Sequence, residues 1–312
     1  MAGAQELQQP VAVRCARGGD PRHRTSLGED GAVPRFTTHD GTESAYHLTG
    51  SGDPLLCVPG GPGRASRYLG DLGGLGAHRQ LVLLDNRGTG DSAAPADPAS
   101  YRRDRLAADV EALRAHLGLD RVDLLGHSAG AGIAIAYAEQ HPDRPSSLIL
   151  LTPALSAVGL AATEQDWADH AATVAHQPWQ ADAVRALLAW SGGEDTRENR
   201  LAAAPLFYGR WDEAAHAHAE AEESERNPDA QAGYRAPGAF DPDRTRAALA
   251  ALRVPTLALA GGADPLSPPH LVRQLAALIP GAAYAEVPDA GHFPWLDDPR
   301  CLVDTIAAFL SR

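Results

Sequence analysis

The segment at 121–130, RVDLLGHSAG, joins a short apolar run to a stretch of helical character through a serine flanked by glycines. Gly126 and Gly130 stand two residues before and after Ser128, in the pattern GxSxG. Glycine has no Cβ atom, so the chain can turn sharply enough here to hold a strained serine at the end of a strand. The helix that follows directs unpaired N–H groups at the same spot, which favours developing negative charge. The segment therefore predicts a strand, a tight turn and a helix, with Ser128 as a candidate nucleophile.

Strand-like apolar runs alternate with segments of helical periodicity along most of the chain, a pattern typical of a parallel sheet covered by helices. Two early runs, at 35–38 and 43–48, predict an antiparallel hairpin at the start of the sheet. Later strands are expected at 55–58, 81–84, 122–125, 148–151, 254–260 and 283–287. Helices are expected at 106–117, 129–140, 268–278 and 298–309. The predicted fold class is therefore α/β, with a mostly parallel sheet flanked by helices.

The strand pattern is interrupted once, since it stops after Thr152 and resumes at Val254. The interval is dominated by alanines, acidic residues and aromatic residues at helical spacing, which predicts a helical cap inserted into the sheet domain. A cap over the edge of a sheet can exclude water and shape a substrate pocket. We expect an N-terminal extension at 1–33, a sheet domain at 34–153 and 247–312, and the cap at 154–246.

Composition and charge exclude several classes of function. The net charge of −13 argues against nucleic acid or an anionic membrane as a partner, because phosphate contacts need a concentrated basic face. No apolar run is long enough to span a bilayer. All 27 basic residues are arginines, and a chain without lysine has no Schiff-base chemistry, no pyridoxal phosphate anchor and no phosphate-loop lysine.

The number of cysteines indicates the redox compartment of the protein, and the spacing of one pair of histidines indicates whether they could bind a metal. Cys15, Cys57 and Cys301 cannot all pair, so we expect a reduced, cytoplasmic protein. His216 and His218 would face different sides of a helix, which favours a solvated helix over a metal site. We therefore expect no metal, no cofactor, and a small molecule or short peptide as the substrate; the oligomeric state stays open.

A seryl nucleophile needs an acid and a histidine later in the chain, each on the turn after a late strand. Asp264 follows the run at 254–260, and His292 follows the run at 283–287. Both turns lie at the same edge of a parallel sheet as Ser128, so the three side chains can converge. A turn aspartate before a proline and a loop histidine satisfied by its neighbours are the alternatives. Position and chain order favour the catalytic interpretation.

The oxyanion that forms when a serine attacks a carbonyl needs N–H donors, and the run CVPGGPG after the strand at 55–58 can supply one. Gly60 and Gly61 allow close approach of the backbone, and the flanking prolines stiffen the loop. We assign the donors as the N–H groups of Gly61 and Ala129. We expect His127 to pack against the site or to support it through a hydrogen bond.

Five short motifs stand after the predicted strands: PGGPG from Pro59, DNRGTGDS from Asp85, GHSAG from Gly126, GGADP from Gly261 and AGHFPW from Ala290. Together they resemble the α/β-hydrolase superfamily and, within it, the proline iminopeptidase branch, over 34–311. The resemblance implies an α/β-hydrolase fold with an inserted cap. Two positions depart from the branch, since Pro59 replaces the motif histidine and Ala129 replaces a bulky residue after the nucleophile. Arg87 and Asp91 are expected to brace the loop near the active site.

Proline iminopeptidases bind the free amino group of the substrate with glutamates of the cap, so the resemblance directs attention to acidic residues there. The candidates are Glu198, Glu213, Glu220 and Glu223. For the acidic run at 219–225, a hydrated helix face is the favoured interpretation, and a carboxylate that binds a substrate amine is the alternative. Aromatic residues of the cap are candidates for lining the pocket, although packing within the cap explains them nearly as well. They include Phe207, Tyr208 and Trp211.

Three classes of function fit this sequence. The first, which the resemblance favours, is a serine aminopeptidase similar to proline iminopeptidases that acts on small peptides or amides through an acyl-enzyme. The second is a hydrolase of carboxylic esters or lactones, which would share every catalytic residue and differ in the cap. The third is a ligand-binding protein of the same fold without catalysis, which an intact triad disfavours.

Overall fold

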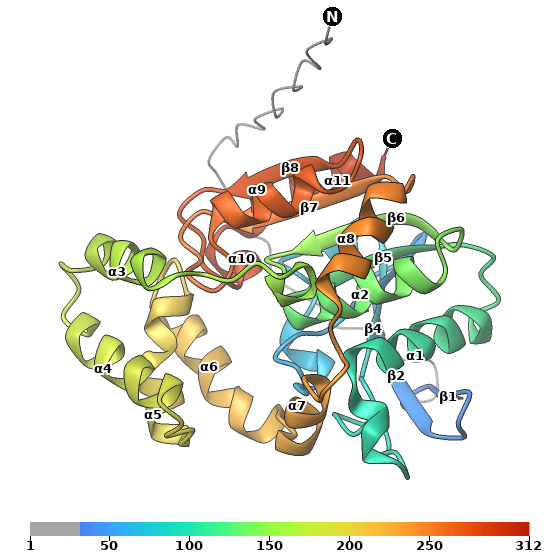
Figure 1. Ribbon diagram of the computed structural model, residues 1–312, viewed down its shortest axis with the longest axis horizontal. Coiled ribbons are helices and arrows are strands. Elements are labelled where there is room, and N and C mark those ends of the chain that lie inside the picture. The colour runs from blue at the N-terminus through green and yellow to red at the C-terminus, as the bar shows by residue number, and fades with distance from the viewer. Residues whose placement is uncertain (1–31, 312) are drawn as a thin grey trace, which may run out of the picture.

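An eight-stranded sheet organises residues 32–311, the part of the chain that this computed structural model describes (Figure 1). The strands lie in the order β1-β2-β4-β3-β5-β6-β7-β8. β1 pairs antiparallel with β2, and β2 with β4, while the other pairs are parallel. The predicted fold class, with its mostly parallel sheet, is confirmed.

The strands lie at the predicted apolar runs, and the largest difference is at β6, which begins at Pro145 rather than at 148. Their bounds are β1 (Arg35–Thr37), β2 (Glu43–Thr49), β3 (Pro54–Val58), β4 (Gln80–Leu84), β5 (Val122–His127), β6 (Pro145–Leu151), β7 (Thr256–Gly261) and β8 (Ala283–Val287).

The central strands are buried on both faces, which explains why they stand in the sequence as continuous apolar runs. In β3, Leu56 and Val58 belong to the core on one face, whereas Leu55 and Cys57 belong to the core on the other. The first face is covered by α1 (Arg103–His116), α2 (Ala129–Gln140), α8 (Pro242–Ala251) and α9 (Pro269–Ala277). The second is covered by α11 (Pro299–Leu310), the short α10 (Pro294–Asp297) and the 3-10 helices η1 (Ser66–Leu69) and η2 (Leu75–Ala77).

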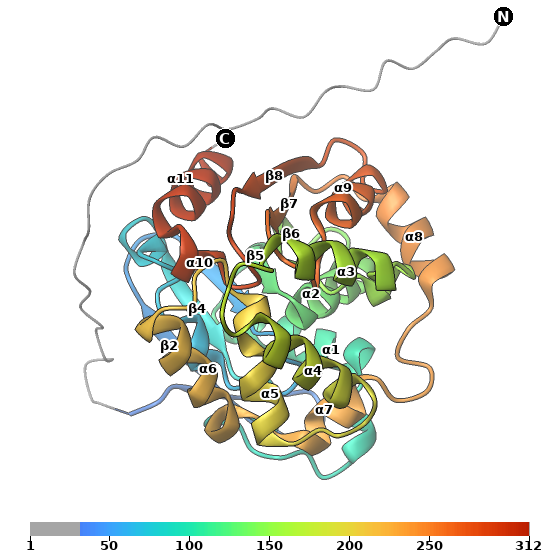
Figure 2. The ribbon, with the colours of Figure 1, turned by 90° about the vertical axis from the view of Figure 1, so that its left-hand side faces the viewer.

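The helices between β6 and β7 leave the sheet and then return to it. Four of them lie on the side toward which the arrowheads of the parallel strands point (Figures 1 and 2): α3 (Glu164–Thr173), α4 (Gln180–Ser191), α5 (Arg197–Ala203) and α6 (Glu213–Glu225). With the 3-10 helix η5 (Ala204–Phe207), they share a core that includes Ala183 and Phe207. α7 (Pro228–Tyr234) and α8 instead contribute Tyr234 and Leu249 to the core of the sheet domain.

The domain limits, including 154–246 for the cap, stay a prediction. The extension predicted at 1–33 falls almost entirely outside the described residues, as does Cys15. Within 32–311, no helix is both long and apolar enough to cross a bilayer. Cys57 is a free thiol inside β3, and burial raises the pKa of this thiol, which makes it a poor nucleophile.

Candidate active site

Ser128 occupies a tight turn between β5 and α2, as the GxSxG pattern predicts. Its φ of 53° and ψ of −119° form a conformation that non-glycine residues rarely adopt. A Cβ atom on Gly126 would collide with the carbonyl oxygen of Gly130, and one on Gly130 would collide with that of Val58. The serine itself is half-buried, so a substrate can reach it.

The side chains of Ser128, His292 and Asp264 form one hydrogen-bonded chain. His292 Nε2 lies 2.8 Å from Ser128 Oγ, and His292 Nδ1 lies 2.8 Å from Asp264 Oδ2. The other oxygen, Asp264 Oδ1, accepts the N–H of Leu266 at 2.9 Å. Asp264 is 2% exposed and His292 is 4% exposed, so water hardly competes for these bonds. The turns after β5, β7 and β8 thus bring the three predicted side chains together.

The backbone of His292 is held by three other segments. Its N–H donates to the carbonyl of Phe207, in the cap, at 2.7 Å. Its carbonyl accepts hydrogen bonds from Thr152 Oγ1 and from His127 Nε2, each at 3.0 Å. The ring is therefore oriented through its backbone as well as by Asp264, and the cap takes part in holding it.

The loop at 59–63, which we call the oxyanion loop after its predicted role, lies against the turn at Ser128. A Cβ atom on Gly60 would lie 2.7 Å from Ser128 Cβ, so a side chain does not fit there. Gly61 follows with φ of 65°. Ala129 is the first residue of α2, where a helical N–H has no acceptor within its own helix. The two predicted donors, Gly61 and Ala129, therefore belong to segments that meet at Ser128.

The four glutamates predicted to bind a substrate amine lie on exposed faces of the cap. Glu198 and Glu213 are exposed in the first turns of α5 and α6. The side chain of Glu220 is 48% exposed, and that of Glu223 is 46% exposed and paired with Arg200. Glu220 and Glu223 line a small pocket of the cap together with Arg197 and Arg200, whose positive charges oppose the binding of an amine.

Sequence reasoning missed the acidic residue of the cap that is buried, Glu225 at the end of α6. Its Oε2 accepts a hydrogen bond from Arg64 Nε at 2.8 Å, and both side chains are almost completely buried. Arg64 directly follows the oxyanion loop and lies over the ring of Tyr68, 4.4 Å from its centre. The N–H of Ala65 also donates to the carbonyl of Glu225. The pair thus joins the cap to the oxyanion loop across 161 positions of sequence, which no local signal could reveal.

Two of the three predicted aromatic residues contact the loop after β8 that carries His292 and Phe293, which we call the histidine loop. Phe207 is buried and accepts the N–H of His292. Tyr208 stacks on Phe293 with ring centres 4.8 Å apart, and Trp211 lies beside Tyr208 at 5.4 Å. The Tyr208 ring thus packs the cap onto the segment that carries the candidate base, whereas the Phe207 ring packs within the cap against Trp167 and Trp190.

The prediction of a solvated helix face holds for His216, which is exposed, but is wrong for His218. His218 Nε2 donates to the carbonyl of Tyr68 at 3.2 Å, and its Nδ1 accepts the hydroxyl of Tyr208 at 2.8 Å. Burial and the nearby Arg64 lower the pKa of His218 to about 3, so the ring is neutral. The side of α6 that carries His218 faces the sheet domain, which a helical pattern alone could not decide.

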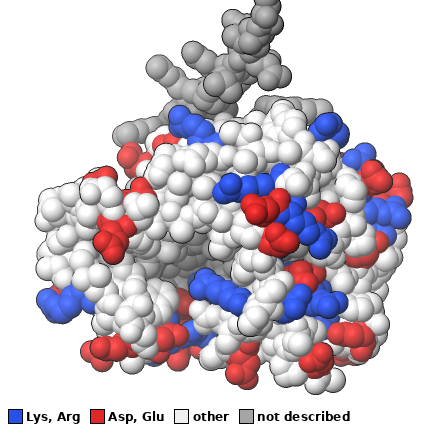
Figure 3. Space-filling model, in the orientation of Figure 1, with Lys and Arg blue, Asp and Glu red and all other residues white. Residues whose placement is uncertain are grey.

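The space-filling view shows a hollow on the face seen in Figure 1, between the cap and the sheet domain (Figure 3). Most of the surface around it is uncharged, and charged side chains lie mainly at the rim. An uncharged hollow suits a neutral or largely apolar substrate better than an ion.

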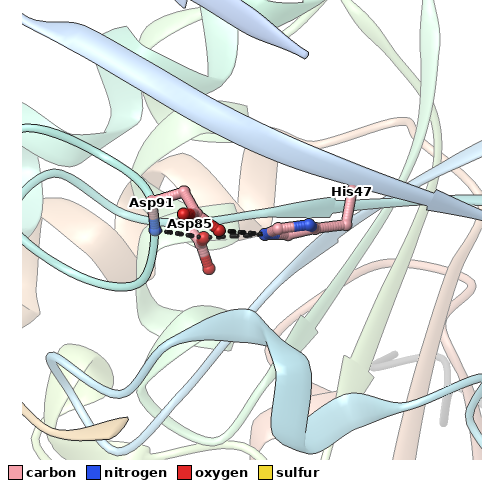
Figure 4. A group of neighbouring side chains, drawn as sticks. All are labelled: His47, Asp85 and Asp91. Carbon is pink, nitrogen blue, oxygen red and sulfur yellow. Dashed lines mark hydrogen bonds and ion pairs between the residues drawn. The ribbon is translucent and has the colours of Figure 1, made fainter. Parts of the chain in front are cut away.

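A second cluster of titratable residues lies between β2 and the turn after β4 (Figure 4). His47 Nε2 lies 2.9 Å from Asp85 Oδ2 and 3.6 Å from Asp91 Oδ2, close enough for a metal ion to be considered. Asp85, however, already accepts hydrogen bonds from the N–H and Oγ of Ser66 and from the N–H of Asp91. The neighbouring Arg87 pairs with Asp109. These contacts brace the loop after β4 and the start of η1.

The ion pair between His47 and Asp85 should make the free energy of unfolding depend on pH, and His47→Gln should remove this dependence. The hydrogen bond to Asp85 raises the pKa of His47 above its ordinary value of 6.5, so the folded chain favours the protonated ring. The stabilisation is therefore fully present below pH 6.5 and is lost as the pH rises through the folded pKa. For a partly exposed pair we expect about 1 kcal/mol between wild type and variant at acid pH, shrinking at alkaline pH. Urea unfolding across this range measures it, and a pH-independent difference would contradict it.

The family model for the alpha/beta hydrolase fold matches residues 53–299. The chain belongs to this family. A proline iminopeptidase from Heyndrickxia coagulans is 37% identical over 112 residues, a match that spans 36% of this α/β hydrolase and only 39% of that enzyme. An N-formylmaleamate deformylase from Pseudomonas putida is 32% identical over 250 residues, 80% of this chain and 85% of that enzyme. A solved esterase from Rhodococcus sp. ECU1013 superposes with a TM-score of 0.71 at 22% identity, covering 89% of this chain and 98% of that one.

Proposed function

We propose that this α/β hydrolase cleaves acyl groups by way of an acyl-enzyme, with Ser128, His292 and Asp264 as its catalytic residues. An unbroken chain of hydrogen bonds from Asp264 through His292 to Ser128 Oγ carries the proposal. A base within hydrogen-bond reach of the nucleophile, itself oriented by a buried carboxylate, is the arrangement that activates a serine.

In the proposed mechanism, His292 carries the protons that are transferred while the acyl-enzyme forms and is hydrolysed. His292 Nδ1–H donates a hydrogen bond to Asp264 and keeps its proton, so Nε2 is free to accept the proton of Ser128 Oγ as that oxygen attacks the acyl carbon. The N–H groups of Gly61 and Ala129 would hold the resulting oxyanion. His292 then protonates the leaving alcohol or amine, and the acyl group remains on Oγ. Water next gives a proton to His292 and attacks the acyl carbon, which releases the acid and returns the proton to Ser128.

Gly60→Ala should lower kcat by about a hundred- to a thousandfold, the range expected when one oxyanion donor is lost. The added Cβ would lie 2.7 Å from Ser128 Cβ and from the carbonyl oxygen of His127, so the oxyanion loop must move away with the N–H of Gly61. Initial rates with a short acyl nitrophenyl ester measure the effect. Gly118→Ala is the control, since its Cβ meets nothing within 4 Å although its φ of 68° strains the backbone. It should cost stability without changing kcat, and a normal kcat in Gly60→Ala would refute the assigned oxyanion site.

The proposed substrates are carboxylic esters, lactones or N-acylated amides that have no free amino group. The predicted glutamates are exposed, and Glu225, the buried acidic residue within the described residues of 154–246, is neutralised by Arg64. Among the described residues of 154–246, no acidic side chain other than Glu225 is buried, so an ammonium group would leave its shell of water without a buried carboxylate to replace it, which would be costly. Two of the similar proteins, the deformylase and the esterase, carry names that agree with this class.

An aminopeptidase is the second candidate, because the iminopeptidase relative is 37% identical over 112 residues. That activity would need a carboxylate free to bind the α-ammonium group of the substrate. Breaking the buried pair between Glu225 and Arg64 to supply one would leave a buried guanidinium without its partner. The pair thus favours the ester class over the aminopeptidase.

Rates on matched substrates separate the two candidates. We expect kcat/KM for a nitrophenyl butyrate ester to exceed that for prolyl nitroanilide by at least about a hundredfold. N-acetylation of the prolyl compound should change its kcat/KM by less than about threefold, since no carboxylate is available for the free amine. A clear preference for the free prolyl compound that Glu225→Gln abolishes would instead establish the aminopeptidase.

A further inference from the structure

Two buried side chains outside the proposed mechanism, Tyr68 and His127, connect the oxyanion loop with the histidine loop. The N–H of Gly60 donates to Tyr68 Oη at 2.6 Å. Tyr68 Oη lies 2.7 Å from His127 Nδ1, and His127 Nε2 lies 3.0 Å from the carbonyl oxygen of His292. We call this chain of three hydrogen bonds the Tyr68–His127 link. The link begins at Gly60, next to the candidate oxyanion donor Gly61, and ends at the carbonyl of His292, the candidate base.

The groups at the two ends and the neutral ring of His127 together decide the direction of every hydrogen bond in the link. The carbonyl of His292 can only accept, so His127 Nε2 carries a proton and donates it. Burial, the largest cause, holds the pKa of His127 well below its ordinary range, so the ring is neutral and Nδ1 is an acceptor. Tyr68 therefore donates its hydroxyl proton to Nδ1, and its oxygen accepts the N–H of Gly60. One arrangement of protons satisfies all four groups, which gives the link a defined geometry.

We propose that Tyr68 and His127 are positioning residues, which keep the oxyanion loop and His292 in the relative placement that reaction at Ser128 requires. The inference rests on the proposed function, because the groups that the link places are the donor and the base of that mechanism. His127 immediately precedes Ser128, so its backbone belongs to the nucleophile turn while its ring connects to both loops.

The two ends depend on the link to different degrees. The carbonyl of His292 also accepts from Thr152 Oγ1, and the N–H of His292 is held by Phe207. For the N–H of Gly60, the acceptor in the structure is Tyr68 Oη, and a buried N–H that loses its partner is costly. Loss of the Tyr68 hydroxyl should therefore disturb the oxyanion loop more than loss of the His127 ring nitrogens disturbs the base.

The oxyanion loop has little freedom to absorb such a disturbance. Gly60 already lies so close to Ser128 Cβ and the carbonyl of His127 that an added Cβ would be 2.7 Å from each. A loop that loses its bond to Tyr68 can move only away from the nucleophile. The expected consequence is weaker stabilisation of the transition state with little change in the binding of substrate.

Tyr68→Phe tests the proposal, because it removes one hydroxyl and keeps the buried ring. We expect kcat for a short acyl ester, and the rate constant for fluorophosphonate labelling of Ser128, to fall together by about 10- to 100-fold while KM changes by less than about twofold. Tyr137→Phe is the matched control, since Tyr137 is also buried and its hydroxyl donates to Glu111 Oε2 at 2.8 Å. This control should lower stability by a similar amount and leave both rates unchanged.

Substitutions at His127 test the same link from its other half. His127→Phe should slow labelling, and His127→Gln, whose amide has both a donor and an acceptor, should recover part of the rate. In the double variant Tyr68→Phe/His127→Phe, the loss should be smaller than the product of the two single losses, because both substitutions break the same link.

The possible outcomes separate this inference from the proposed function. A wild-type chain that is labelled at Ser128, together with a Tyr68→Phe rate within about threefold of wild type, would overturn the positioning role alone. The positioning role would also be overturned if Tyr137→Phe lowered the rates as much as Tyr68→Phe does. It would be overturned, too, if the loss of rate in the double variant equalled the product of the losses in Tyr68→Phe and His127→Phe. A wild-type chain that is not labelled at Ser128 would overturn the proposed function, and the positioning role with it.

Discussion

Ser128→Ala should reduce kcat for a short acyl ester by about four to six orders of magnitude. The substitution removes Oγ, the atom that bonds to the acyl carbon, while His292 keeps its 2.8 Å hydrogen bond to Asp264. Only substrate binding and the oxyanion donors would remain, and these give a small residual rate over water. The variant should also resist fluorophosphonate labelling, which the mass of the intact protein shows directly.

A serine elsewhere in the sheet provides the control for this variant. Ser147 is buried in β6, and its Oγ donates to Asp123 Oδ1 at 2.8 Å. Ser147→Ala therefore removes a buried hydroxyl and its hydrogen bond, but it should retain labelling and turnover. If Ser128→Ala were still labelled at the wild-type rate, Ser128 would not be the nucleophile.

Asp264→Asn should lower kcat by about three to four orders of magnitude, although it changes the shape of the side chain very little. Asp264 Oδ1 accepts the N–H of Leu266, so the amide oxygen of the asparagine should keep that place. The amide NH₂ would then face His292 Nδ1 and force it to become an acceptor. The proton of the neutral ring would move to Nε2, where it prevents His292 from accepting the proton of Ser128.

The ring tautomer of His292 provides a readout for this variant besides the rate. Nitrogen NMR should place the proton on Nδ1 in the wild-type chain and on Nε2 in Asp264→Asn. Asp123→Asn is the control, since Asp123 also accepts two hydrogen bonds, from the side chains of Arg79 and Ser147, but lies in β5. It should reduce stability and leave kcat unchanged. A wild-type kcat in Asp264→Asn would remove Asp264 from the mechanism.

The positions of Ser128, Asp264 and His292 could be predicted because each follows a strand whose apolar run is plain in the sequence. Parallel strands of one sheet end at the same edge, so three residues far apart in the chain were expected to meet there. The close approach of the backbone at Gly60 could be predicted from the pair of glycines after β3. In the structure, the nearby His127 and Ser128 leave no room for a Cβ atom at Gly60.

The sequence did not predict which side chains of the cap helices are buried. Glu223 and Glu225 stand two residues apart on α6, yet the first is exposed and the second is buried against Arg64. His216 and His218 differ in the same way, because one faces solvent and the other faces the sheet domain. A helical pattern shows that two residues lie on different sides of a helix, but it does not show which side is covered.

The sequence by itself determined the fold class, the tight turn at Ser128 and the strand ends that carry Ser128, Asp264 and His292, because strand periodicity and glycine geometry act over a few residues. Only the tertiary structure decided that Arg64 neutralises Glu225 and that Tyr68 and His127 join the oxyanion loop to His292. Those contacts depend on the distances between segments far apart in the chain. For the same physical reason, the proposed chemistry of this α/β hydrolase follows from local motifs, whereas the proposed substrate class rests on how the cap packs.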